Sequence, residues 1–105
     1  MEKPDLSYLN SLSGGDKSFE HKILEVIREE FPGELNEYTE NVKNKKLATA
    51  AENVHKIKHK ISILGLKETY GLAEKHEDLL KSSDTSLVKE FDAALNILTD
   101  YINKI

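Results

Sequence analysis

The chain has 105 residues, of which 38% are hydrophobic and 32% are charged, and its formal net charge at pH 7 is −4. This composition is typical of a globular domain. The chain contains neither a run of roughly 20 consecutive apolar residues, which a helix needs to cross a bilayer, nor a secretory leader. We therefore expect a cytoplasmic protein without membrane insertion. The absence of cysteine excludes disulfides, thiolate zinc sites and thiol catalysis, and the negative charge argues against nucleic acid as the main partner.

Two helices are expected at the N-terminal end of the chain. Leucines at one-turn spacing predict the first over residues 5–12, and the glycine pair at 14–15 is typical of a helix stop. Asp16 is the expected N-cap of the second helix. The apolar stripe of that helix would consist of five residues: Phe19, Ile23, Val26, Ile27 and Phe31.

Pro32 is expected to end the second helix and to start a third. Proline is tolerated in the first turn of a helix but removes a backbone hydrogen bond from an interior, so the pair Pro32-Gly33 predicts a boundary. The third helix would then run to the polar segment 43–46, which is the expected loop. It would turn three residues inward: Leu35, Tyr38 and Val42.

Three more helices are predicted, over residues 47–64, over residues 66–80, and from the turn at 82–84 to the end of the chain. The last would face six residues inward: Val88, Phe91, Leu95, Leu98, Ile102 and Ile105. Helices of similar length joined by short connections pack as antiparallel neighbours. We therefore expect one all-α domain over residues 1–105. It would be an antiparallel up-and-down four-helix bundle of the last four helices, with the first two packed against it.

His55 lies outside the apolar stripe of the helix predicted over residues 47–64. That stripe consists of Leu47, Ala50, Val54, Ile57, Ile61 and Leu64. Lys58 and His59 follow His55 by three and four residues and are therefore its neighbours on the helix surface. A neutral imidazole is a good nucleophile near neutral pH, because the ordinary pKa of histidine is about 6.5. The spacing predicts an exposed nucleophile beside a cation.

Lysines are concentrated around this helix. Residues 43–60 hold six lysines and one acid, whereas residues 16–40 hold eight acids and three bases. The lysine-rich segment is expected to form a positive face that attracts an anionic group or an acidic protein surface. A solvated helix face without a partner is the alternative interpretation.

The motif His-x-Ile-Lys at residues 55–58, with Gly65 ten residues after the histidine, resembles the signature of a known family. These are the histidine-containing phosphotransfer (HPt) domains of bacterial multi-step phosphorelays. The resemblance implies a four-helix bundle with the histidine on its second helix. It also implies that His55 is phosphorylated, that Lys58 stabilises the phosphoryl group, and that Gly65 permits tight packing near the helix end.

The resemblance extends to the N-terminal segment 5–16 and to the small Ala51, one turn before the histidine. It implies a phosphocarrier that exchanges its phosphoryl group with receiver domains of response regulators or of a hybrid sensor histidine kinase. The chain has no glycine-rich phosphate loop and no room for an ATP-binding domain, so we expect no kinase activity of its own. Mg²⁺ is expected on the receiver domain, with no cofactor or metal on this chain, which we expect to be a monomer.

His59 stands where the family usually has glycine. Its ring, one turn from His55, could crowd a docking receiver domain, donate a hydrogen bond to the phosphoryl group, or narrow the set of partners. The expected docking surface consists of five residues: Ala51, Glu52, His59, Lys60 and Ser62.

Two other functions fit parts of the pattern. A helical adaptor would bind an acidic partner through the lysine-rich face without phosphorylation, and it would keep binding after His55→Gln. His55 and His59 also have the i, i+4 spacing of two metal ligands on a helix. However, His21, His76 or a carboxylate would have to complete such a site, and His76 is expected to be a buried packing residue.

Overall fold

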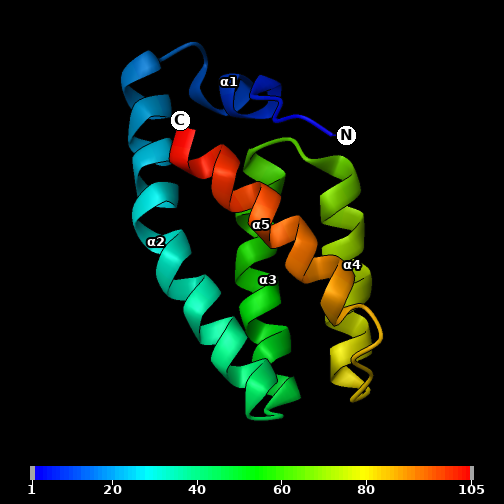
Figure 1. The fold of residues 1–105 in the computed structure, drawn as a ribbon. Coiled ribbons are helices and arrows are strands. Elements are labelled where there is room, and N and C mark those ends of the chain that lie inside the picture. The colour runs from blue at the N-terminus through cyan, green and yellow to red at the C-terminus, as the bar shows by residue number, and fades with distance from the viewer. Residues whose placement is uncertain (1, 105) are drawn as a thin grey trace.

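The computed structural model describes residues 2–104 and shows five helices, with no strand among those residues. In chain order they are α1 (Ser7–Ser13), α2 (Lys17–Lys43), α3 (Leu47–Ile63), α4 (Lys67–Lys81) and α5 (Val88–Lys104). The helices α2, α3 and α4 run alternately up and down, α5 lies obliquely across them, and α1 covers one end (Figure 1). The predicted all-α bundle is confirmed, with five helices in place of six. No helix within residues 2–104 is long and apolar enough to cross a bilayer.

The helix α2 is continuous over 27 residues where two helices were predicted. The expectation that Pro32 would end a helix is wrong, although proline in a helix interior costs roughly 3 kcal/mol. Phe31 and Tyr38 lie on either side of Pro32, and both are buried in the same core. Because the two halves of α2 pack on one core, tertiary packing outweighs the local cost of the proline.

A buried ion pair also spans the proline. Lys60 of α3 is only 7% exposed, and its Nζ lies 3.0 Å from carboxylate oxygens of both Glu30 and Glu34. These two acids flank Pro32 on α2. One ammonium group therefore ties the turns before and after the proline to α3.

The N-terminal half of α2 is less buried than its apolar pattern predicted. Ile27 and Phe31 are buried and Ile23 is half-buried, but Phe19 and Val26 are 42% and 47% exposed. A helix of 27 residues is about 40 Å long, whereas α3, which starts beside the C-terminal end of α2, has 17 residues. The first turns of α2 therefore extend beyond α3. At the other end of the chain, the predicted inward residue Ile105 lies outside the described residues.

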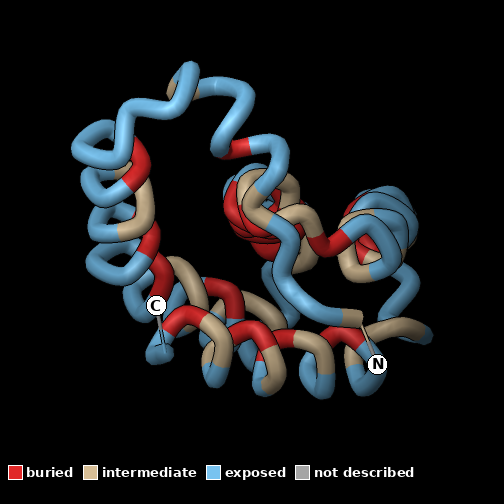
Figure 2. Tube along the Cα trace, turned by 90° about the horizontal axis from the view of Figure 1, so that it is seen from above, coloured by how far each residue is buried: buried red, intermediate tan, exposed pale blue. Residues whose placement is uncertain are grey.

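The central helix of the bundle is α3. Seen from the end that α1 covers, it lies between α2 and α4, with α5 alongside (Figure 2). Its apolar stripe is buried as predicted, apart from the half-buried first residue; the buried members are Ala50, Val54, Ile57, Ile61 and Leu64. The side of α3 that faces away from the core is exposed and includes Ala48, Glu52, His55, Lys56 and His59.

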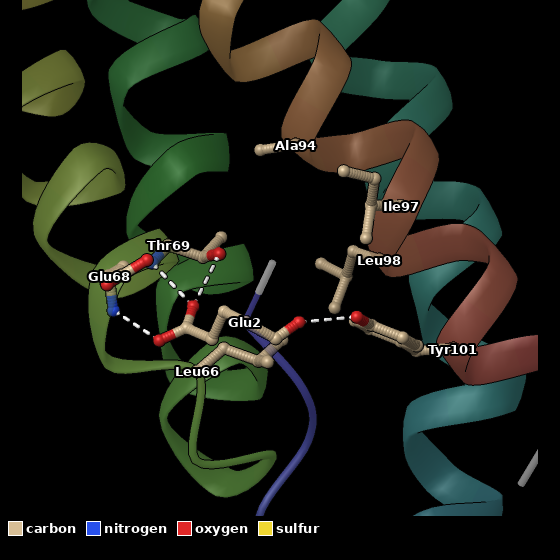
Figure 3. A pocket seen from close by; sticks show the side chains of 8 residues that line it. All are labelled: Glu2, Leu66, Glu68, Thr69, Ala94, Ile97, Leu98 and Tyr101. Carbon is tan, nitrogen blue, oxygen red and sulfur yellow. Dashed lines mark hydrogen bonds between the residues drawn. The ribbon is translucent and has the colours of Figure 1, made fainter.

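The N-terminal segment is tied to α4 and α5 through Glu2. The Glu2 carboxylate accepts hydrogen bonds from the backbone N–H groups of Glu68 and Thr69 and from the Thr69 hydroxyl, so it caps the first turn of α4 (Figure 3). The Tyr101 hydroxyl of α5 donates to the Glu2 carbonyl oxygen. Burial acts to raise the pKa of Glu2, but the hydrogen bonds outweigh it and hold that pKa below its ordinary value. The carboxylate therefore caps α4 in its charged form at neutral pH.

Gly65 lies where the N-terminal segment crosses the turn between α3 and α4. Its φ is +71°, a left-handed conformation that favours glycine. The backbone N–H of Asp5 donates to the carbonyl oxygen of Leu64 at 2.8 Å, and a Cβ atom at residue 65 would overlap the carbonyl oxygen of Asp5. Both the backbone conformation and the close approach of the N-terminal segment require glycine here.

We expect Gly65→Ala to lower the free energy of unfolding by more than about 1 kcal/mol, because the methyl group meets both a strained φ and the Asp5 carbonyl. Gly71→Ala is the matched control, since Gly71 lies inside α4 and a Cβ there meets no atom within 4 Å. That variant should gain about 0.5–1 kcal/mol. Urea unfolding followed by circular dichroism checks both values, and equal stabilities of the two variants would contradict this account of Gly65.

Candidate functional site

His55 lies on the exposed side of α3 with its side chain 53% exposed. Beside it is an open hollow of about 660 Å³ between α3 and α4. The lining residues are Ala48, Ala51, Glu52, His55, Lys56, Glu77 and Lys81. Two of these are alanines on the turns of α3 before the histidine, and their small side chains help to leave the hollow open.

A buried carboxylate from α4 holds the His55 ring on one side. Glu77 has a side chain only 8% exposed, and its Oε2 lies 3.3 Å from His55 Nδ1. A carboxylate has acceptor capacity alone, so this contact favours the neutral tautomer that carries its hydrogen on Nδ1. The lone pair is then on Nε2, at the other edge of the ring, which is the arrangement that a nucleophilic imidazole requires.

Glu77 also binds two lysines. Its Oε1 lies 2.9 Å from Lys58 Nζ, and its Oε2 lies 3.3 Å from Lys81 Nζ. Burial acts to raise the pKa of Glu77. The opposite effect of Lys58, Lys81 and the neighbouring His55 is larger, so the pKa of Glu77 lies below its ordinary value. The Glu77 carboxylate in turn raises the pKa of Lys58 against the effect of desolvation. Both groups are therefore charged at neutral pH.

Lys58 is not the free surface cation that its spacing predicted. Its side chain is 11% exposed, its ammonium group pairs with Glu77, and its Nζ lies 5.6 Å from the centroid of the Tyr70 ring. The expectation that Lys58 would be displayed in solvent beside His55 is wrong, because α4 covers it. Glu77 connects the two residues instead.

His59 lies next to His55 on the exposed side of α3. The ring centroids are 4.9 Å apart, and the rings are inclined at 69° in an edge-to-face arrangement. Ser62 follows one turn later, half-buried, at the border of a smaller hollow that Tyr8 and Tyr70 also line. The structure thus aligns three of the expected site residues, His55, His59 and Ser62, along one side of α3.

Lys60 lies on another side of α3 from the rest of the expected docking surface. It is buried against α2 in the ion pairs with Glu30 and Glu34, so its ammonium group is not available next to His55. Ala51 is buried under the hollow and Glu52 is exposed at its edge. The expected positive face is reduced accordingly, because the lysines at 58 and 60 each pair with carboxylates from a neighbouring helix.

Glu77 and Lys81 were missed by the sequence analysis. A signal for Glu77 was present, since it lies four residues after Ala73 and three before Leu80, both of which are buried. A carboxylate on the apolar stripe of a helix needs a cation from the helix packed against it. The order of residues alone does not say which cation that is.

The described residues do not complete a metal site around the two neighbouring histidines. Residues 2–104 contain no group of three or more histidine, aspartate or glutamate side chains that could hold a metal ion. His76 is fully buried, its Nε2 shares a 2.7 Å hydrogen bond with the Tyr38 hydroxyl, and burial lowers its pKa. The expectation that His76 is a packing residue is confirmed. His21 lies exposed on α2, beside Leu24, Glu25 and Arg28.

These features define a helical bundle that presents an exposed imidazole held by a buried carboxylate. Among known families, the model of the Hpt domain matches residues 22–104, which include most of α2 and all of α3, α4 and α5. The chain therefore belongs to the Hpt domain family. Comparisons with curated proteins and with solved structures gave no match.

Hpt domains carry out histidine phosphotransfer in phosphorelays and interact with receiver domains and kinases of two-component systems. This family match confirms the resemblance seen in the sequence over residues 22–104, which form most of the helical bundle. The matched range begins at residue 22, so the N-terminal segment 5–16, which also resembled the family, lies outside it.

We expect Glu77→Gln to lower the free energy of unfolding by about 2–3 kcal/mol at neutral pH, because it leaves Lys58 buried without a counter-charge. The pKa of Glu77 lies below its ordinary value of 4.5. Its contribution to stability is therefore present above that value and is lost as the pH falls through the lowered pKa. The difference between wild type and variant should shrink over this acidic range in urea unfolding at a series of pH values.

Two further variants test whether the loss comes from this ion pair. Asp78→Asn removes an exposed charge from the same turn of α4 and should change stability little. Adding Lys58→Met to Glu77→Gln removes the unpaired ammonium group and should restore part of the lost stability. A double variant that is less stable than Glu77→Gln alone would show that Lys58 is not left uncompensated.

Proposed function

We propose that this Hpt domain is an intermediate of a multi-step phosphorelay and that His55 carries the phosphoryl group. His55 would accept it from the aspartyl phosphate of one receiver domain and pass it to the aspartate of another. The observation that carries this proposal is the contact of Glu77 with His55 Nδ1. It leaves Nε2 as the nucleophile on a half-exposed ring beside an open hollow.

In the proposed reaction, the Nε2 lone pair forms a bond to phosphorus while the bond from phosphorus to the aspartate oxygen breaks. The electron pair of the broken bond stays with the aspartate carboxylate. The hydrogen on Nδ1 remains in place, so the ring gains positive charge, which the Glu77 carboxylate stabilises at 3.3 Å. Transfer to the next receiver is the same step in reverse. The receiver supplies Mg²⁺, and this chain supplies a positioned nucleophile.

Lys58 contributes to the proposed site mainly through Glu77. Its ammonium group compensates the buried carboxylate at 2.9 Å, which allows Glu77 to remain charged and to orient the imidazole. Lys58 is thus a positioning residue for His55 in addition to the phosphate-stabilising role that the family resemblance implies.

The proposed docking surface for receiver domains follows α3 along Glu52, His55, His59 and Ser62, with the buried Ala51 at the floor of the hollow and Lys56 and Lys81 at its border. Lys60 is no longer included, because it is buried against α2. The pocket of a receiver domain that holds Mg²⁺ is rich in carboxylates, so the two exposed lysines complement its charge.

The direct test compares wild type with His55→Gln after incubation with a phosphorylated receiver domain or a small phosphoramidate donor. We expect an acid-labile phosphoryl adduct in the intact mass of the wild type and none in the variant, because Nε2 of His55 is the acceptor. His21→Gln is the matched control, since His21 is an exposed histidine on α2 and its loss should leave the adduct unchanged.

Two outcomes would contradict the proposal. No adduct on the wild type with either donor would favour a helical adaptor that binds without phosphorylation. An adduct that survives His55→Gln would assign the phosphoryl group to a different residue.

Electrostatic attraction of the receiver domain is tested by the salt dependence of transfer. We expect the rate of transfer at low receiver concentration to fall several-fold as ionic strength rises from about 0.01 M to about 1 M, because the Debye length shortens from about 30 to about 3 Å. Lys56→Gln should be slower at low salt and less sensitive to salt, whereas Lys22→Gln, an exposed lysine near the start of α2, should behave as wild type. Stopped-flow or quenched-flow transfer kinetics provide the measurement, and rates independent of salt would rule out the attraction.

A further inference from the structure

We propose that His59 donates a hydrogen bond to the phosphoryl group on His55 and so prolongs the life of the phosphorylated state. This inference rests on the proposed function, because it concerns the phosphorylated form of His55. It assigns a role to a side chain that replaces the glycine usual at this place in the family.

The two rings are close enough for such a contact. Their centroids lie 4.9 Å apart, and both side chains are exposed on the same side of α3. Glu77 occupies the Nδ1 edge of His55, so a phosphoryl group is attached at the Nε2 edge. The proposal places its oxygens on the exposed side of α3 that the two rings share, where a ring N–H of His59 can meet them. The exposed His59 ring can rotate to make this contact without disturbing the core.

The charges nearby leave room for a further donor. Lys58 and Lys81 are both paired with Glu77, and Lys60 is paired with two acids of α2. Lys56 is exposed and lines the same hollow as His55, but residues one position apart on a helix do not face each other. His59, one turn along α3, is the side chain with donor capacity that lies directly next to the His55 ring.

The charged groups next to the two histidines are largely paired with one another. Glu77 of α4 is held by Lys58 and Lys81, and Lys60 faces α2, where it is held by Glu30 and Glu34. A phosphoryl dianion on His55 would therefore add negative charge that these pairs do not compensate, and a ring N–H of His59 would meet it as a charge-assisted hydrogen-bond donor.

The energetic effect follows from the nature of phosphoryl transfer. In a loose transition state, the non-bridging oxygens carry less charge than in the starting phosphohistidine, so a donor to those oxygens stabilises the starting state more. His59 should therefore slow spontaneous hydrolysis.

The experiment loads wild type and three variants with a phosphoramidate, removes the donor, and follows the loss of the phosphoryl group by intact mass and by ³¹P NMR. His59→Gln keeps a hydrogen-bond donor, His59→Phe keeps the ring without a donor, and His59→Gly restores the residue usual in the family. We expect the half-life to fall about fivefold in His59→Phe and His59→Gly, and to fall less in His59→Gln. Circular dichroism of each variant checks folding.

Each outcome separates this inference from the proposed function. If neither the wild type nor any variant is phosphorylated on His55, the proposed function itself is wrong. If His55 is phosphorylated but the half-lives are equal in wild type and His59→Gly, His59 has no role in the phosphorylated state. If His59→Phe is as long-lived as wild type, the ring shields the phosphoryl group from water, and the hydrogen bond proposed here is absent.

Discussion

The carboxylate of Glu77 is the group on which the rest of the site depends. It lies buried between α3 and α4, and it contacts His55, Lys58 and Lys81 at once. A buried carboxylate is costly to desolvate, and a buried ammonium group is equally costly, so each makes the other tolerable. The same charge that compensates Lys58 also fixes which nitrogen of His55 faces the protein. Stability of the helix pair and orientation of the imidazole therefore come from one group.

The bundle holds α3 by ionic contacts on two opposite sides. Lys58 reaches α4 and Lys60 reaches α2, because residues two positions apart on a helix point in nearly opposite directions. Each lysine ends in a largely buried contact with glutamate, in addition to the apolar stripe that α3 buries in the core. At its C-terminal end, α3 is held by the hydrogen bond from the Asp5 N–H to the Leu64 carbonyl oxygen. His55 is thus displayed from a helix that is fixed along its length, which suits a side chain that must keep one orientation.

The spacing of residues along the sequence predicted the helices, but it did not predict contacts between residues that lie far apart in the chain. Apolar spacing located the helices and placed His55 outside the buried stripe of α3, which the structure bears out. The prediction of a helix boundary at Pro32 was wrong, because the packing of Phe31 and Tyr38 on one core outweighs the local cost of proline inside a helix. The prediction that Lys58 and Lys60 belong to an exposed positive face was wrong for a related reason. Their carboxylate partners lie 19 or more positions away and belong to other helices. The capping of α4 by Glu2 likewise joins residues 66 positions apart.

The pairing of the lysines also bears on the strength with which the proposed site holds a phosphoryl group. A carrier must bind this group firmly enough to receive it and weakly enough to pass it on, so a set of free cations around His55 would oppose transfer to the next aspartate. Glu77 reduces that attraction by engaging Lys58 and Lys81, while it stabilises the positive charge that the ring gains on phosphorylation. In the proposed phosphorelay, Glu77 would thus moderate the attraction for the phosphoryl group while it supports the phosphorylated ring, and His59 would adjust how long the phosphorylated state lasts.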